Sequence, residues 1–292
     1  MQLAGAITAL VTPFRNGKVD EEAYRELIEW QIEQKIDGIV PCGTTGESAT
    51  LSHAEHEHVI EICVDQVKKR IPVLAGAGSN NTTEAISLLR FAKKAGADAG
   101  LMLTPYYNKP TQEGVFQHFK AIAAEVNLPM VIYNVPGRTG LNVLPATLAR
   151  MAKEIPTVVA TKEASGNIAQ ISECIEFCGP DFTVLVGDDF VVLPAMAMGA
   201  KGVISVTSNI APRKVRDLCQ AYVDGNIPLA QKLHFELAPL NRICFIETNP
   251  IPVKTALHLM GKIGPDFRLP LVDLAPANAQ ALRKTLQAAA LV

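Results

Sequence analysis

The candidate catalytic residues of this sequence stand where apolar runs end. Lys162 closes the apolar run of residues 157–161, and Tyr133 and Arg138 stand at the end of the run before it. A lysine must be neutral to attack a carbonyl, and a free lysine with a pKa near 10.4 is only about 0.1 % neutral near pH 7.4. A desolvated pocket favours the neutral amine because it penalises the ammonium. These three residue types at neighbouring strand ends indicate a Schiff-base site.

The sequence contains eight apolar runs, and the candidate catalytic residues lie at the ends of two of them. The runs are nearly continuous, which is typical of parallel strands buried on both faces. They cover residues 5–14, 37–43, 72–78, 99–105, 129–136, 157–165, 182–189 and 201–209. Segments with helical period lie between them, for example residues 21–35, 54–70 and 83–95. Strands and helices that alternate in this way predict a (β/α)8 TIM barrel, an α/β fold whose chemistry lies at the C-terminal ends of the strands.

The barrel pattern ends before the chain does. The eighth unit is complete near Tyr222, and residues 227–240, 251–260 and 278–291 read as helices. We therefore expect a catalytic barrel over residues 1–223 and a C-terminal helical extension over residues 224–292. No Gly-x-Gly-x-x-Gly sequence follows a predicted strand, which disfavours a doubly wound dinucleotide-binding fold.

The composition narrows the class of protein and its partners. Of the 292 residues, 48 % are hydrophobic but only 5 % aromatic, so the core must be aliphatic. The net charge is −2, and no basic stripe stands out, so a nucleic acid is not an expected partner. The apolar run at residues 3–11 is short, follows no basic region and meets Pro13, so it predicts a strand rather than a signal peptide or a membrane span. Six scattered cysteines without a Cys-x-x-Cys pair suit a reducing cytoplasm.

Two groups of residues invite a metal interpretation. Cys174 and Cys178 are one helical turn apart, and His53, His56 and His58 lie close together in the sequence. Neither group has the spacing or the additional ligands of a known site, so we expect ordinary thiols and helix residues instead. Imine chemistry supplies its own electron sink, and we therefore expect neither a metal nor another cofactor.

Six sequence blocks resemble one known family. They are GTTGES (43–48), TPYYNKPTQEG (104–114), YNVPGRTG (133–140), KEASGN (162–167), GDD (187–189) and GVISVTSN (202–209). Their order and spacing are similar to those of the dihydrodipicolinate synthases over essentially the whole chain. The resemblance implies a lyase that condenses pyruvate with L-aspartate 4-semialdehyde to 4-hydroxy-tetrahydrodipicolinate, on the diaminopimelate and lysine pathway.

The resemblance also implies catalytic roles. Lys162 would form the imine with pyruvate, and Tyr133 would donate and accept protons. A phenol with a pKa near 10 needs a relay to move protons near neutral pH. Thr44 and Tyr107 match the relay positions of the family, with Tyr107 expected to reach in from a neighbouring subunit of a homotetramer built as a dimer of dimers.

Four further residues match substrate-binding positions. Thr45 and the backbone of Ile204 would hold pyruvate, and Gly187 would let substrate approach the backbone closely. Arg138 would bind the carboxylate of the second substrate through a charge-assisted pair.

A third set matches the site at which L-lysine inhibits members of the family. It comprises Ser48, Ala49, His53, His56, Asn80, Glu84 and Tyr106. Glu84 can pair with the ammonium of the inhibitor, while Asn80 and Tyr106 can hydrogen-bond its polar groups. Tyr106 adjoins the relay Tyr107, which gives feedback a short route to the chemistry.

Other interpretations remain open for the sequence alone. A related aldolase that acts on a sugar acid, such as N-acetylneuraminate lyase or 2-keto-3-deoxygluconate aldolase, is one, and a non-catalytic metabolite-binding homologue is another.

Some single residues also allow a structural interpretation. Thr44 and Glu47 have the spacing of a helix capping box. Asp188 and Asp189 are interpreted as structural. Pro41-Cys42 and Thr248 depart from the pattern of the family without touching its catalytic set.

Overall fold

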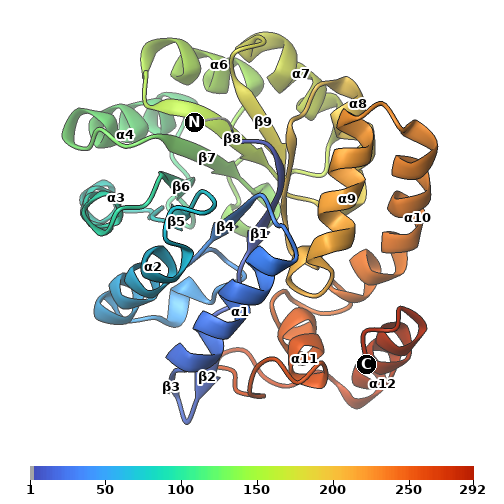
Figure 1. Ribbon diagram of the computed structural model, residues 1–292. Coiled ribbons are helices and arrows are strands. Elements are labelled where there is room, and N and C mark those ends of the chain that lie inside the picture. The colour runs from blue at the N-terminus through green and yellow to red at the C-terminus, as the bar shows by residue number, and fades with distance from the viewer. Residues whose placement is uncertain (1–2) are drawn as a thin grey trace. The chain divides into compact units, whose positions relative to one another are not determined.

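The computed structural model describes residues 3–292 of the chain (Figure 1). These residues form two compact units. The first comprises residues 3–5 and 72–204, and the second comprises residues 6–71 and 205–292. The chain therefore passes from one unit to the other near Gly5, Ile71 and Ile204.

The first unit contains a parallel sheet covered by helices. Its strands pair in the order β10-β9-β8-β7-β6-β5. In sequence they are β5 (Leu74–Gly76), β6 (Ala99–Leu103), β7 (Met130–Asn134), β8 (Val158–Glu163), β9 (Thr183–Val186) and β10 (Gly202–Ser205). The helices between them are α3 (Thr82–Ala95), α4 (Gln112–Glu125), α5 (Pro136–Thr139), α6 (Pro145–Glu154), α7 (Ile168–Cys178), the 3-10 helix η2 (Asp189–Val191) and α8 (Val192–Met198). Figure 1 shows α3, α4, α6 and α7 on the outer side of the strands.

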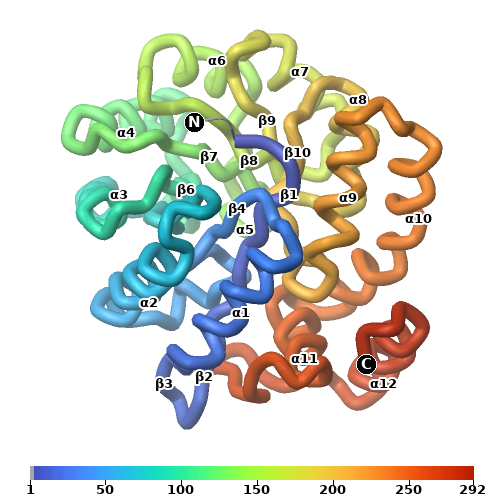
Figure 2. The backbone as a smooth tube through the Cα atoms, viewed as in Figure 1, coloured from blue at the N-terminus to red at the C-terminus, as the bar shows by residue number. Residues whose placement is uncertain are grey.

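The second unit contains the other two parallel strands and the C-terminal helices. Strand β1 (Gly5–Ala9) pairs with β4 (Gly38–Val40), and β2 (Phe14–Arg15) forms a short hairpin with β3 (Lys18–Val19). The helices are α1 (Glu21–Glu33), η1 (Ser48–Thr50), α2 (His53–Val67), η3 (Thr207–Asn209), α9 (Pro212–Val223), α10 (Ile227–Ile243), α11 (Ile251–Leu259) and α12 (Pro276–Ala288). Figures 1 and 2 both show α9 and α10 side by side.

Each predicted strand is present, but every strand is shorter than its apolar run. The run at residues 5–14 is an example, because β1 ends at Ala9 while Leu10, Val11 and Phe14 remain buried. Burial of apolar side chains continues into the loop, whereas the ladder of backbone hydrogen bonds does not. Hydrophobicity alone therefore predicts where a strand lies better than where it ends.

The helix that follows β4 begins later than one sequence pattern suggested. Thr44 and Glu47 do not form the capping box that their spacing allows. Glu47 has a left-handed backbone (φ +52°), and its side chain makes no capping hydrogen bond. The box is formed instead by Ser52 and Glu55, where the Glu55 amide donates to Ser52 Oγ (3.3 Å) and the Ser52 amide donates to Glu55 Oε2 (2.9 Å). These bonds satisfy amides of the first turn and fix the start of α2 at His53.

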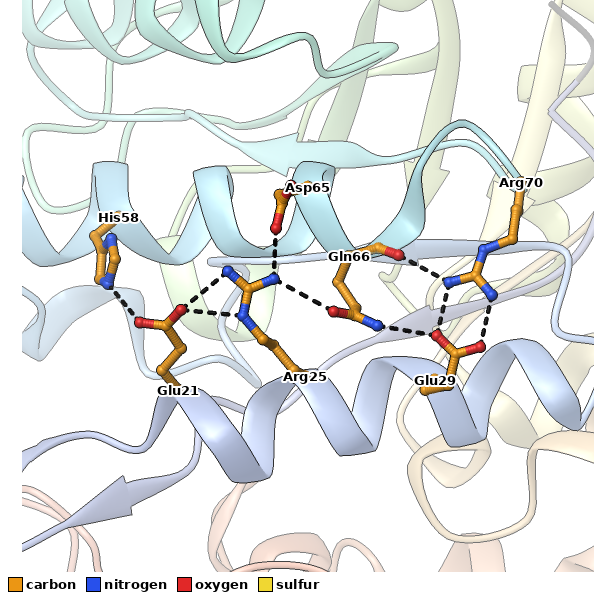
Figure 3. Close-up of polar contacts among 7 residues, drawn as sticks. All are labelled: Glu21, Arg25, Glu29, His58, Asp65, Gln66 and Arg70. Atoms are coloured by element: carbon orange, nitrogen blue, oxygen red, sulfur yellow. Dashed lines mark hydrogen bonds and ion pairs between the residues drawn. The ribbon is translucent and has the colours of Figure 1, made fainter.

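A ladder of seven polar residues joins α1 to α2 (Figure 3). Arg25 connects the helices through Glu21 on its own helix and Asp65 on α2, the latter at 2.6 Å. Glu29 is bound by both terminal nitrogens of Arg70, at 2.6 and 2.7 Å, and this pair lowers the pKa of Glu29 to about 2. The remaining members are His58 and Gln66. Bidentate geometry and the shared partners make this ladder a stronger link than isolated surface pairs.

Candidate active site

The predicted imine lysine and the predicted proton donor are neighbours in the first unit. The parallel register of β7 and β8 places Tyr133 opposite Lys162, and both side chains are buried. Lys162 Nζ lies 4.2 Å from the centroid of the Tyr133 ring. The two residues that sequence reasoning placed at neighbouring strand ends are therefore in contact.

Gly187 lies beside the same lysine. A Cβ atom added at position 187 would stand 2.8 Å from Lys162 Cε and 2.6 Å from Ala164 Cβ. Real carbon contacts of this kind lie beyond 3.0 Å, so any larger residue would push the lysine side chain away. Gly187 was predicted to leave room for the substrate. In the structure, the missing side chain at this position also leaves room for Lys162.

A buried carboxylate follows the lysine directly. Glu163 is 1 % exposed, and its oxygens accept from Asn134 Nδ2 (2.9 Å), Gln170 Nε2 (3.2 Å) and the Ser165 amide (2.8 Å). Asn142 joins the cluster through hydrogen bonds to Asn134 and Gln170. Burying a carboxyl group costs free energy unless its oxygens are hydrogen-bonded, and these three bonds meet that need. Because the network joins the ends of β7 and β8, it holds Tyr133 and Lys162 in position.

Sequence reasoning assigned no role to this network. Asn134 and Glu163 stand beside Tyr133 and Lys162 in their motifs, which was the available signal. Adjacent residues of a strand point to opposite faces, so a polar pair next to a catalytic pair must have partners of its own on the other side.

Three predicted lysine-site residues also gather in the first unit. Asn80 Nδ2 donates to the Tyr106 carbonyl at 3.1 Å, and Glu84 accepts a hydrogen bond from Ser79 Oγ. Partial burial raises the pKa of Tyr106, and the negative charge of Glu84 raises it further. The cluster thus offers a carboxylate, an amide and a phenol within a short distance of one another.

Two other predicted residues of this unit are open to solvent. Tyr107 is 90 % exposed and has a left-handed backbone (φ +71°). Arg138 is exposed in the single turn of α5. Asp188 caps η2 by accepting from the Phe190 amide at 2.9 Å, which agrees with its structural interpretation.

Ile204 is buried in β10 of the first unit. The other predicted residues belong to the second unit. Thr44 and Thr45 lie on the loop after β4, Ser48 and Ala49 in η1, and His53 and His56 in the first turn of α2. Thr45 is buried, and its Oγ1 accepts from Asn249 Nδ2 at 3.0 Å. Glu47, two residues further on, pairs with Lys254 Nζ at 2.5 Å. Neither Asn249 nor Lys254 was singled out from the sequence, because more than 200 residues separate each from its partner.

The side chains of residues 3–292 include no group of three or more His, Cys, Asp or Glu arranged to hold a metal ion. All six cysteines are free thiols, and only Cys178 is partly exposed. Over the same residues, none of the helices has the length and apolar character needed to span a membrane.

Comparison with known proteins decides the family. Residues 2–289 match the Dihydrodipicolinate synthetase family. The chain belongs to this family. A 4-hydroxy-tetrahydrodipicolinate synthase of Nitratidesulfovibrio vulgaris (strain Miyazaki F) is 64 % identical over 292 residues, which is the full length of both chains.

Solved structures of the Dihydrodipicolinate synthetase family agree with the fold. A chloride-inhibited dihydrodipicolinate synthase of Acinetobacter baumannii, complexed with pyruvate, is 46 % identical, with a TM-score of 0.97 over all of both chains. The enzyme of Cyanidioschyzon merolae, with lysine bound, is 40 % identical, with a TM-score of 0.95 over 99 % of each chain. The predicted (β/α)8 fold with its C-terminal helices is confirmed.

Membership of the Dihydrodipicolinate synthetase family confirms the activity implied by the sequence. The chain is a lyase that condenses pyruvate with L-aspartate 4-semialdehyde to 4-hydroxy-tetrahydrodipicolinate in diaminopimelate and lysine biosynthesis. The comparisons do not support a sugar-acid aldolase, because the 64 % identical relative is a synthase.

Proposed function

We propose that the condensation runs through a Schiff base on Lys162. The amine attacks the pyruvate carbonyl, water leaves, and loss of a methyl proton gives an enamine whose carbon attacks the aldehyde. The observation that supports this role most strongly is the contact of buried Lys162 with Tyr133, 4.2 Å from amine to ring centroid. A buried amine beside a phenol combines a nucleophile with a proton donor and acceptor.

The proposed proton path and pyruvate contacts use four more residues. Thr44 and Tyr107 relay protons to and from Tyr133, and Tyr107 is supplied by a neighbouring subunit. Its 90 % exposed side chain supports that assignment, because it has little contact with its own chain. Thr45 and the backbone of Ile204 hold pyruvate. No metal or other cofactor has a role in these steps.

Arg138 is proposed to bind the carboxylate of aspartate semialdehyde. It follows β7 by only a few residues and is exposed, and the planar guanidinium of an arginine can bind a carboxylate in a bidentate pair. Removing one charge-assisted partner costs roughly 1.5–3 kcal/mol, or about ten- to a hundredfold.

We therefore expect Arg138→Ala to raise the KM for aspartate semialdehyde about ten- to a hundredfold, with formation of the pyruvate imine largely retained. Steady-state kinetics with each substrate varied in turn measures the change. Arg90→Ala is the matched control, since Arg90 is an exposed arginine paired with Glu125 on neighbouring helices. Loss of pyruvate binding in Arg138→Ala would assign the residue to the first substrate instead.

We also propose that L-lysine inhibits the enzyme at the site predicted from the sequence, which includes Asn80, Glu84 and Tyr106. The support is the cluster of Asn80, Glu84 and Tyr106 in the first unit and the bound lysine in the Cyanidioschyzon merolae relative. The carboxylate of Glu84 provides a partner for an ammonium group, and the amide of Asn80 provides one for a carboxylate.

Glu84→Gln should weaken lysine inhibition about tenfold while leaving turnover without lysine nearly unchanged. The substitution preserves size and an acceptor for Ser79 but removes the charge. An activity titration with L-lysine on both proteins measures the shift. Equal inhibition of wild type and variant, or a wild type insensitive to millimolar lysine, would show that Glu84 does not bind the inhibitor.

The assembly and location of the enzyme are also proposals. We propose a cytoplasmic homotetramer, a dimer of dimers, in which Tyr107 crosses a subunit boundary. In sequence order we divide the chain into a catalytic barrel over residues 1–223 and a helical extension over residues 224–292. Light scattering at working concentration gives the subunit number directly.

A further inference from the structure

We propose that Asn249 is a positioning residue for pyruvate, because it orients the hydroxyl of Thr45. The inference rests on the proposed role of Thr45 in holding pyruvate and extends it to the C-terminal part of the chain. It assigns a function to a residue that lies 204 positions from its partner in the sequence.

The hydrogen bond fixes which way the Thr45 hydroxyl can donate. Asn249 Nδ2 lies 3.0 Å from Thr45 Oγ1, and both residues are at most 5 % exposed. A threonine hydroxyl has one proton to donate, while its oxygen can accept. Since the oxygen accepts from the Asn249 amide, the proton of Thr45 is directed away from Asn249 and is available to a second acceptor.

The loop itself is held firmly on both sides of Thr45. The Thr12 hydroxyl donates to the Gly46 carbonyl at 2.7 Å, and a Cβ at Gly46 would stand 3.1 Å from the Leu10 carbonyl oxygen. On the far side, Glu47 pairs with Lys254, and both side chains are 1 % exposed. The backbone at Thr45 is therefore fixed, and the direction of its hydroxyl is the freedom that Asn249 removes.

The chemistry of the substrate matches this arrangement. The pyruvate carboxylate only accepts hydrogen bonds, so a residue that holds it must present a donor. A donor that is already oriented loses less freedom on binding than one that rotates among several acceptors. The segment that carries Asn249 is also held in place. Lys254, five residues further along the chain, donates from Nζ to the Asp266 carbonyl at 2.9 Å.

Two substitutions of Asn249 separate orientation from simple packing. Asn249→Ala removes the donor, and we expect the KM for pyruvate to rise about tenfold with kcat within about threefold of wild type. Asn249→Asp keeps the size of the side chain but turns it into an acceptor, which draws the Thr45 proton and repels the pyruvate carboxylate. We expect its KM for pyruvate to rise about a hundredfold.

The control is Asn226→Ala. Asn226 caps α10 by accepting from the Leu229 amide at 3.2 Å, so its loss lowers stability without touching Thr45. A purely structural role for Asn249 predicts that both substitutions lower the free energy of unfolding, as Asn226→Ala does, without a selective rise in the KM for pyruvate. Orientation predicts a rise in that KM, larger for Asp than for Ala, with the KM of Asn226→Ala unchanged.

The decisive comparison is the double variant Thr45→Val/Asn249→Ala. Since Asn249 acts through the Thr45 hydroxyl, the double variant should bind pyruvate no more than about twofold worse than Thr45→Val alone. Losses that multiply, or a KM within twofold of wild type in both Asn249 variants, would overturn the inference. Borohydride trapping at Lys162 in the same variants tests the Schiff base separately, so the two proposals can fail independently.

Discussion

Replacing Lys162 with arginine should reduce the rate of condensation by about 10³-fold or more. Arginine keeps the positive charge but does not lose its proton in proteins, so it cannot form the imine. The measurement is the initial rate at saturating concentrations of both substrates. Lys153→Arg, an exposed lysine near the end of α6, is the matched control and should retain wild-type activity.

The expected loss depends on chemistry rather than on folding. Lys162 contacts the Tyr133 ring and lies against Gly187, so the variant must also be shown to be folded by near-ultraviolet circular dichroism. A folded Lys162→Arg enzyme with more than a tenth of wild-type activity is incompatible with a covalent role for this residue.

The second large effect concerns the buried pair of Glu47 and Lys254. Burial lowers the pKa of Lys254, while Glu47 opposes that shift, and each side chain is 1 % exposed. Removing one partner leaves the other charge buried without compensation, which costs about 3–5 kcal/mol. We therefore expect Lys254→Met and Glu47→Gln each to lower the free energy of unfolding by about this amount in urea titrations.

Two comparisons test the reason for that loss. The double variant Glu47→Gln/Lys254→Met removes both charges and should be more stable than the sum of the single losses predicts. The exposed pair of Lys232 and Glu236, 3.8 Å apart with side chains 70 % and 40 % exposed, provides the control. Lys232→Met should change stability by less than about 1 kcal/mol. Additive losses at Glu47 and Lys254 would show that their charges act independently.

The sequence predicted the parts of the fold that depend on local pattern. The helical period of residues 21–35 predicted a helix, and the structure has α1 there, with Tyr24, Leu27 and Ile28 buried. The strand ends that carry Tyr133 and Lys162 were predicted because a continuous apolar run followed by a polar residue is a local signal. Strand bounds were not, since Leu10 and Val11 are buried outside the β1 ladder.

The contacts that hold the site together depend on tertiary packing. The spacing of Thr44 and Glu47 allowed a capping box as an alternative interpretation, but the box is formed by Ser52 and Glu55, which have the same spacing. The actual partner of Glu47, Lys254, is 207 residues away, and no local pattern connects them. Asn249 was missed for the same reason.

Reductive trapping with pyruvate tests whether Lys162 forms the Schiff base. The enzyme is incubated with pyruvate, reduced with borohydride, digested, and the modified peptide is located by mass spectrometry. We expect a single pyruvate adduct on Lys162, absent without pyruvate and absent from Lys162→Arg. No adduct, or an adduct on another lysine with Lys162 unmodified, would contradict it.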